Sequence, residues 1–124
     1  MTALAGCIIL VVEDEPLVAL DIAECFERVG ATSIIARTLA DAMDKTDTPG
    51  LTGAVIDHAL HDGITTSDVC EKLSQLNVPF IVYSGYNKLD GACAQGKLVQ
   101  KPATSLMLLT TLKGVLAEHR RQMN

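Results

Sequence analysis

Polar residues of three kinds follow four short apolar runs of this 124-residue sequence. In chain order these polar residues are Glu13 and Asp14, then Asp57, Ser84 and Lys101. The apolar runs are rich in aliphatic residues, as expected of buried strands. Three carboxylates that come together repel one another and raise each other's pKa unless a cation lies between them. We therefore predict a divalent cation with oxygen ligands, and Mg²⁺ fits because it keeps several of its waters.

A carboxylate beside a divalent cation can also attack phosphorus and form an aspartyl phosphate. Asp57 is the preferred nucleophile because it is the lone acid at the end of a buried run. The Lys101 ammonium would pair with Asp57 or with the phosphoryl group, whose oxygens need to be neutralised. The Ser84 hydroxyl would bind a further phosphoryl oxygen, and Gly85 would leave space beside it.

Three more oxygen donors are predicted to hold the cation together with Asp57. Asp14 is expected to bind directly, and Glu13 to bind as a second ligand or through a water. The backbone carbonyl of Ala59, two residues beyond Asp57, would supply another oxygen. Glu13 and Asp14 could instead simply favour the start of the next helix. A third acid on a distant strand end makes the cation site the better interpretation.

The order of the elements explains how these residues could meet. Helical patterns alternate with five apolar runs, over residues 7–12, 33–36, 54–56, 80–83 and 98–99. The helices are expected to begin at Pro16, at the possible capping boxes Thr38-x-x-Asp41 and Thr65-x-x-Asp68, at Asn87 and at Ser105. The Asn87–Gln95 helix is interrupted by Gly91. Five β-α units predict an α/β domain with a parallel sheet, in which ligands bind at the carboxyl ends of the strands.

Length and composition limit the classes of protein to which this chain can belong. A chain that is 48% hydrophobic over 124 residues supports one domain, expected over 1–124 with a core over 7–117. A net charge of −5 argues against non-specific nucleic-acid binding and favours cations or protein partners. No apolar run approaches about 18 residues, and the start lacks the basic region of a secretory signal. Four cysteines without a C-x-x-C pair fit a reducing, cytoplasmic setting best, although their number alone would also allow disulfides.

Four short motifs together resemble the receiver domain of two-component response regulators. They are Val11-Val12-Glu13-Asp14-Glu15, Asp57-x-x-Leu60 with Gly63, Ser84-Gly85 and Lys101-Pro102. The resemblance runs from Ile8 to about Leu116. It implies a flavodoxin-like (βα)5 sandwich with sheet order 2-1-3-4-5. It also implies a bacterial phosphoprotein that receives a phosphoryl group on Asp57 from a histidine kinase or a histidine phosphotransfer protein.

A finer resemblance concerns residues 79–86, Pro-Phe-Ile-Val-Tyr-Ser-Gly-Tyr. This segment is similar to the Pro-Phe-x-Phe-Ala-Thr-Gly-Tyr motif of the FAT GUY group, which consists mostly of stand-alone receivers common in alphaproteobacteria. Three positions depart from the wider family: His61 stands where proline is frequent, Leu98 where an aromatic is usual, and Ser84 where threonine is commoner. Because Leu98 lacks a ring, switching is expected to use a different coupling, for which Tyr83 and Tyr86 are candidates.

The resemblance implies a switch in protein–protein interaction that depends on phosphorylation. The chain would then be no enzyme beyond its own phosphotransfer and dephosphorylation, and would contact neither nucleic acid nor the membrane interior. Its downstream partner would bind the face formed by the fourth helix, the fifth strand and the fifth helix. Two alternatives stay open: a degenerate receiver that acts without phosphorylation, and a small Mg²⁺-dependent phosphatase. The phosphatase is disfavoured because Ala59 stands where its general acid would be needed.

Overall fold

Five parallel strands form a single sheet in the order β2-β1-β3-β4-β5. The computed structural model describes residues 3–123, without the side chain of Asp62. The strands are β1 Ile8–Val12, β2 Thr32–Ala36, β3 Gly53–Asp57, β4 Phe80–Ser84 and β5 Lys97–Gln100. The order confirms the predicted flavodoxin-like topology. All residues of β3 and β4 are buried, because helices cover both faces of the sheet.

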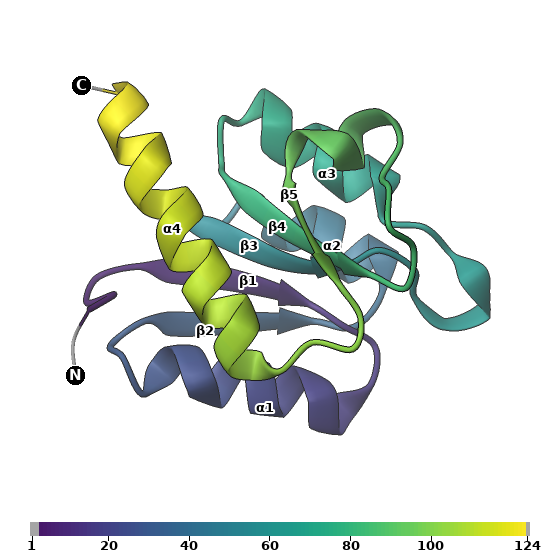
Figure 1. Cartoon of the computed structure of the whole chain (residues 1–124), viewed down its shortest axis with the longest axis horizontal. Coiled ribbons are helices and arrows are strands. Elements are labelled where there is room, and N and C mark those ends of the chain that lie inside the picture. The colour runs from purple at the N-terminus through teal and green to yellow at the C-terminus, as the bar shows by residue number, and fades with distance from the viewer. Residues whose placement is uncertain (1–2, 124) are drawn as a thin grey trace.

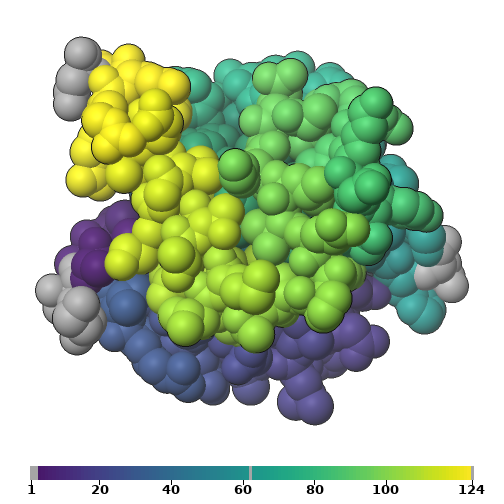
Figure 2. Space-filling model, viewed as in Figure 1, coloured from purple at the N-terminus to yellow at the C-terminus, as the bar shows by residue number. Residues whose placement is uncertain are grey.

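The helices form two outer layers (Figure 1). The four α-helices are α1 Pro16–Glu27, α2 Leu39–Lys45, α3 Ser67–Gln75 and α4 Ser105–Met123. Side chains of α1 and α4 pack into one core on one face of the sheet, and side chains of α2 and α3 pack into a second core on the other. The space-filling view shows α4 lying across the front of the molecule (Figure 2).

Local sequence accounts for the ends of two helices. Pro16 is the first residue of α1, where a missing backbone N–H costs nothing. The Thr38 hydroxyl accepts a hydrogen bond from the Asp41 N–H at 3.1 Å and caps α2, as predicted. Within residues 3–123, no helix combines the length and the apolar character that crossing a membrane requires.

The predicted helix over 87–95 is wrong as an α-helix. The structure has a short 3₁₀ helix there instead, η2 Gly91–Gln95, and residues 3–123 hold four α-helices rather than five. Gly91 has a φ of +58°, which lies outside the right-handed helical region and prevents a regular helix from running through it. The fourth crossover of the (βα)5 fold is therefore a loop with one 3₁₀ segment. The expected partner-binding face correspondingly consists of η2, β5 and α4.

The predicted capping box at Thr65 is also wrong. The residue that precedes α3 is Thr66, and its side chain makes no capping hydrogen bond. The Thr66 hydroxyl instead donates to the carbonyl oxygens of Asp57 at 2.9 Å and His58 at 3.1 Å. Thr66 is fully buried, so these bonds tie the start of α3 to the end of β3.

Candidate functional site

The carboxylates of Glu13, Asp14 and Asp57 meet at the carboxyl-terminal edge of the sheet. One carboxylate oxygen of each residue lies within 4.8 Å of those of the other two. Glu13 is the first residue after β1, and Asp57 is the last residue of β3, the strand next to it. The Glu13 N–H donates to the Ala36 carbonyl at 3.0 Å, so the ladder of β1 with β2 continues past the strand and fixes this residue.

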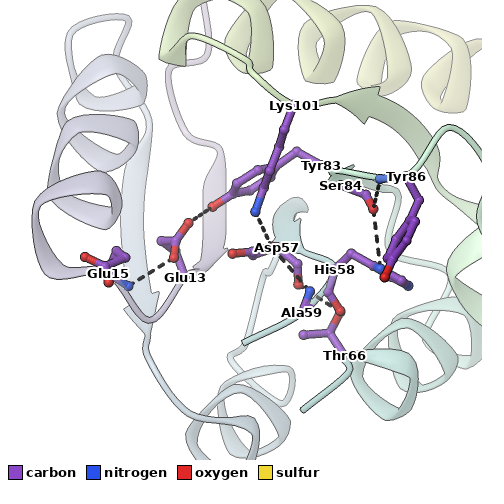
Figure 3. A network of polar contacts seen from close by, with 10 residues as sticks. All are labelled: Glu13, Glu15, Asp57, His58, Ala59, Thr66, Tyr83, Ser84, Tyr86 and Lys101. Carbon is purple, nitrogen blue, oxygen red and sulfur yellow. Dashed lines mark hydrogen bonds and ion pairs between the residues drawn. The ribbon is translucent and has the colours of Figure 1, made fainter. Parts of the chain in front are cut away.

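Glu13 is held by two hydrogen bonds on its two carboxylate oxygens (Figure 3). Oε2 accepts from the Glu15 N–H at 3.0 Å, and Oε1 accepts from the Tyr83 hydroxyl. The side chain is 3% exposed, and this burial raises its pKa to about 6. The nearby charge of Asp57 adds to the rise in pKa, while the bonds from Glu15 and Tyr83 oppose it.

Lys101 forms an ion pair with Asp57. Its Nζ lies 2.9 Å from Asp57 Oδ1, and the Ala59 N–H donates to the same oxygen at 3.3 Å. The Lys101 N–H donates to the Ser84 carbonyl at 2.7 Å, which places this residue directly beyond β5 at the edge of the sheet. The ammonium also lies 5.2 Å from the centre of the Tyr83 ring, a cation–π distance. In Figure 3 the second carboxylate oxygen of Asp57 points toward Glu13.

The Ser84 hydroxyl contacts Tyr86 and His58 rather than Lys101. Its hydroxyl oxygen accepts from the Tyr86 N–H at 3.1 Å and lies 3.4 Å from His58 Nδ1. The His58 and Tyr86 rings meet edge to face, with centroids 6.1 Å apart (Figure 3). No hydrogen bond joins Ser84 to Asp57, although the structure describes both side chains. Any contact between Ser84 and a group on Asp57 therefore requires its hydroxyl to turn.

The donor set of this site fits a hard divalent cation. Three carboxylates face one another, and among the described side chains a single ammonium, that of Lys101, pairs with them. Oxygen-only donors of this kind suit Mg²⁺. Glu13, Asp14 and Asp57 are the side chains that would hold it. Because both oxygens of Glu13 already accept hydrogen bonds, Glu13 is better placed to act through a water than as a direct ligand.

Glu13, Asp14, Asp57 and Lys101, which the sequence predicts to meet, lie side by side in the structure. Ser84, predicted at the same edge, is directed toward His58. The hydrogen bond from Tyr83 to Glu13 is not among the contacts that the sequence predicts. Tyr83 pairs in register with Asp57 and stands one position before the end of β4. A tyrosine at that place is the one sequence signal that could have indicated a hydroxyl at this site.

Comparison with solved structures identifies the fold. No protein-family model matches the sequence, and no curated protein matches it. A CheY-like response regulator receiver domain protein from Methanospirillum hungatei JF-1 superposes with a TM-score of 0.81, covering 95% of this chain and 99% of that one at 23% identity. This chain has the fold of a CheY-like receiver domain.

Two further solved structures match this chain over nearly the same length. A response regulator receiver protein from Sinorhizobium medicae WSM419 gives a TM-score of 0.79 at 22% identity, over 92% of this chain and 97% of that one. SdrG from Sphingomonas melonis Fr1 gives a TM-score of 0.74 at 29% identity, over 94% and 99%. The likeness therefore spans the whole sheet and both helical layers rather than one half of the fold.

Leu98 has a packing role in this receiver fold. It lies in β5 opposite Val82 and packs, half-buried, against the core on the side of α2 and α3. An aliphatic side chain here fills space in that core and offers no ring that could swing between two positions. Tyr86, by contrast, is 69% exposed and touches the His58 ring beside Ser84.

Proposed function

We propose that this chain is the phosphoacceptor receiver of a two-component phosphorelay, with Asp57 as the phosphorylated residue. The observation that carries this proposal is the meeting of three carboxylates with Lys101 at one edge of a receiver fold. The phosphoryl donor would be a histidine kinase or a histidine phosphotransfer protein. Phosphorylation would change which protein binds the face formed by η2, β5 and α4.

The chemistry is a direct transfer of a phosphoryl group. An Asp57 carboxylate oxygen forms a bond to phosphorus while the bond from phosphorus to the donor's histidine nitrogen breaks. Oδ1 is held by Lys101, so the oxygen on the side of Glu13 is the better placed nucleophile. When bound, Mg²⁺ supplies positive charge that offsets the charge on the phosphoryl oxygens. Lys101 supplies the same kind of stabilisation from the chain itself.

The Ser84 hydroxyl would report the new charge. In the structure it accepts from Tyr86 and lies beside His58. A phosphoryl group on Asp57 offers this hydroxyl a charged acceptor, which is a stronger partner than a neutral one. When the Ser84 hydroxyl turns toward the phosphoryl group, it loses its hydrogen bond from the Tyr86 N–H, and this frees the loop that carries Tyr86. Because Leu98 is aliphatic, we propose that the change spreads through His58 and Tyr86 rather than through β5.

A phosphate mimic tests this proposal without a kinase. Adding beryllofluoride with Mg²⁺ should shift the amide resonances near Asp57 and Ser84 in an NMR spectrum of the full chain. The Asp57→Asn variant is the matched control and should stay unchanged. An unchanged spectrum in the wild type would instead support an interaction module that is independent of phosphorylation.

Repeated turnover separates the proposal from a small phosphatase. Ala59 places a methyl group two residues beyond Asp57, where a phosphatase of this chemistry needs a second acid. The chain is therefore expected to act on no substrate beyond its own aspartyl phosphate. Multiple rapid turnovers of p-nitrophenyl phosphate with Mg²⁺ would contradict this expectation.

A further inference from the structure

Two buried thiols outside the carboxylate site lie in contact. The Sγ atoms of Cys70, in α3, and Cys93, in η2, are 2.8 Å apart. A disulfide bond has a length of about 2.05 Å, so less than about 1 Å separates this arrangement from bonding distance. The two elements pack side by side, with η2 in the green segment next to α3 (Figure 1).

The two thiols differ in acidity because they share a hydrogen bond. A hydrogen bond from Cys70 stabilises the Cys93 thiolate and lowers the pKa of Cys93 to about 7. The same bond, together with burial, raises the pKa of Cys70. A thiolate is the nucleophilic form of cysteine. Cys93 is therefore suited to react first, and Cys70 to attack the oxidised sulfur in a second step.

Access to the pair lies through η2. Both side chains are fully buried, yet Cys93 belongs to a single short 3₁₀ segment in which Gly91, Ala94 and Gln95 are exposed. The space-filling view shows the green chain before β5 at the molecular surface (Figure 2). Short 3₁₀ segments have poorer hydrogen-bond geometry than α-helices, and such elements open locally more readily than a core strand. A small oxidant would reach the two sulfur atoms once this segment alone opens locally.

We propose that Cys70 and Cys93 form a reversible disulfide when the protein meets a peroxide. The Cys93 sulfur attacks one peroxide oxygen and the O–O bond breaks. Cys93 becomes a sulfenic acid, and the other oxygen departs as a first water. The Cys70 sulfur then attacks the Cys93 sulfur, the S–O bond breaks, and a second water leaves. The two thiols lose two electrons and two protons in total, and hydrogen peroxide is reduced to two waters.

The bond would join η2, the 3₁₀ segment of the crossover from β4 to β5, to α3, the helix of the preceding crossover. Oxidation would fix η2 covalently to α3. The first turn of α3 follows Thr66, whose hydroxyl donates a hydrogen bond to the Asp57 carbonyl. A receiver in the disulfide form would hold η2 in place. The inference goes beyond the proposed phosphotransfer, because it needs neither a phosphoryl donor nor a divalent cation.

Counting thiols in the native chain tests the proposal. The full chain is treated with hydrogen peroxide, then denatured and alkylated with iodoacetamide, and its intact mass gives the number of free thiols. Of the four cysteines, two should escape alkylation in the wild type. Peptide mapping should find Cys70 joined to Cys93, and dithiothreitol should restore all four thiols.

Two variants make the assignment specific. Cys25→Ser removes a half-buried thiol elsewhere in the fold and should leave the disulfide unchanged. Cys93→Ser should leave every remaining thiol open to alkylation, and circular dichroism shows whether this variant is folded. Full alkylation of the oxidised wild type would overturn the proposal, as would sulfinic acid without a cross-link, or a bond that involves Cys7 or Cys25. None of these results bears on phosphorylation of Asp57.

Discussion

Glu13 combines deep burial with a neighbouring carboxylate, and its pKa of about 6 compares with 4.5 for an ordinary glutamate. A carboxyl group with a raised folded-state pKa takes up protons on folding between these two values. In the absence of divalent cations, the Glu13 contribution to stability should therefore fall as pH rises from 4.5 to about 6. Urea unfolding in EDTA across this range measures the effect, which should amount to about 1–2 kcal/mol.

The matched control for this pH dependence is Glu13→Gln. The amide keeps the size of the side chain and cannot ionise, so the difference between the two proteins isolates Glu13 from all other acids. The wild type should lose stability relative to Glu13→Gln as pH rises through the interval. A difference that stays constant, or that changes in the opposite direction, would show that the raised pKa of Glu13 is wrong.

The hydroxyl of Tyr83 should stabilise the charged form of Glu13. Tyr83→Phe removes the donor to Oε1 and leaves a buried carboxylate oxygen short of a partner. The loss should be about 1–3 kcal/mol at pH 7 and smaller at pH 5, where Glu13 is protonated. Chemical denaturation at the two pH values measures both.

The exposed Tyr86 provides the comparison for Tyr83. Tyr86→Phe removes an equivalent hydroxyl from a side chain that is 69% exposed. Its effect on the free energy of unfolding should stay within about 0.5 kcal/mol. Equal effects in the two variants would mean that the bond from Tyr83 to Glu13 contributes little.

At the scale of elements, two adjacent threonines have unequal roles. Thr66 is buried and bonds to the carbonyls of Asp57 and His58, whereas Thr65 is exposed. Thr66→Val keeps the shape and removes both bonds, so it should cost about 1–3 kcal/mol. Thr65→Ala should cost less than about 0.5 kcal/mol. Thermal unfolding measures both changes, and a larger loss from Thr65→Ala would contradict the role given to Thr66.

The sequence predicted the strands and most helices because their patterns are local. Continuous apolar runs correctly located β1, β3 and β4, and Pro16 correctly located the start of α1. The choice between Thr65 and Thr66 depends on hydrogen bonds to Asp57 and His58, which lie outside the four residues of a capping box, so the capping pattern could not decide it. Likewise, Gly91 weakened the helix over 87–95, but only the backbone shows that its φ is positive.

At the scale of the whole molecule, the parallel topology of the sheet brings residues that are far apart in the sequence to one site. Glu13, Asp57 and Lys101 belong to three different strand ends, and the order β2-β1-β3-β4-β5 brings those ends to one edge. This convergence could be predicted because ligands of open α/β sheets bind where the strands end. The direction of Ser84 could not, since it depends on how His58 and Tyr86 pack in the loops.

The proposed receiver function depends on phosphorylation of Asp57, and intact mass measures this directly. The full chain, incubated with acetyl phosphate and Mg²⁺, should gain the mass of one phosphoryl group. Omitting Mg²⁺ or replacing Asp57 by asparagine should abolish the gain. A wild-type protein that stays unmodified, or an Asp57→Asn variant that gains the same mass, would contradict the account.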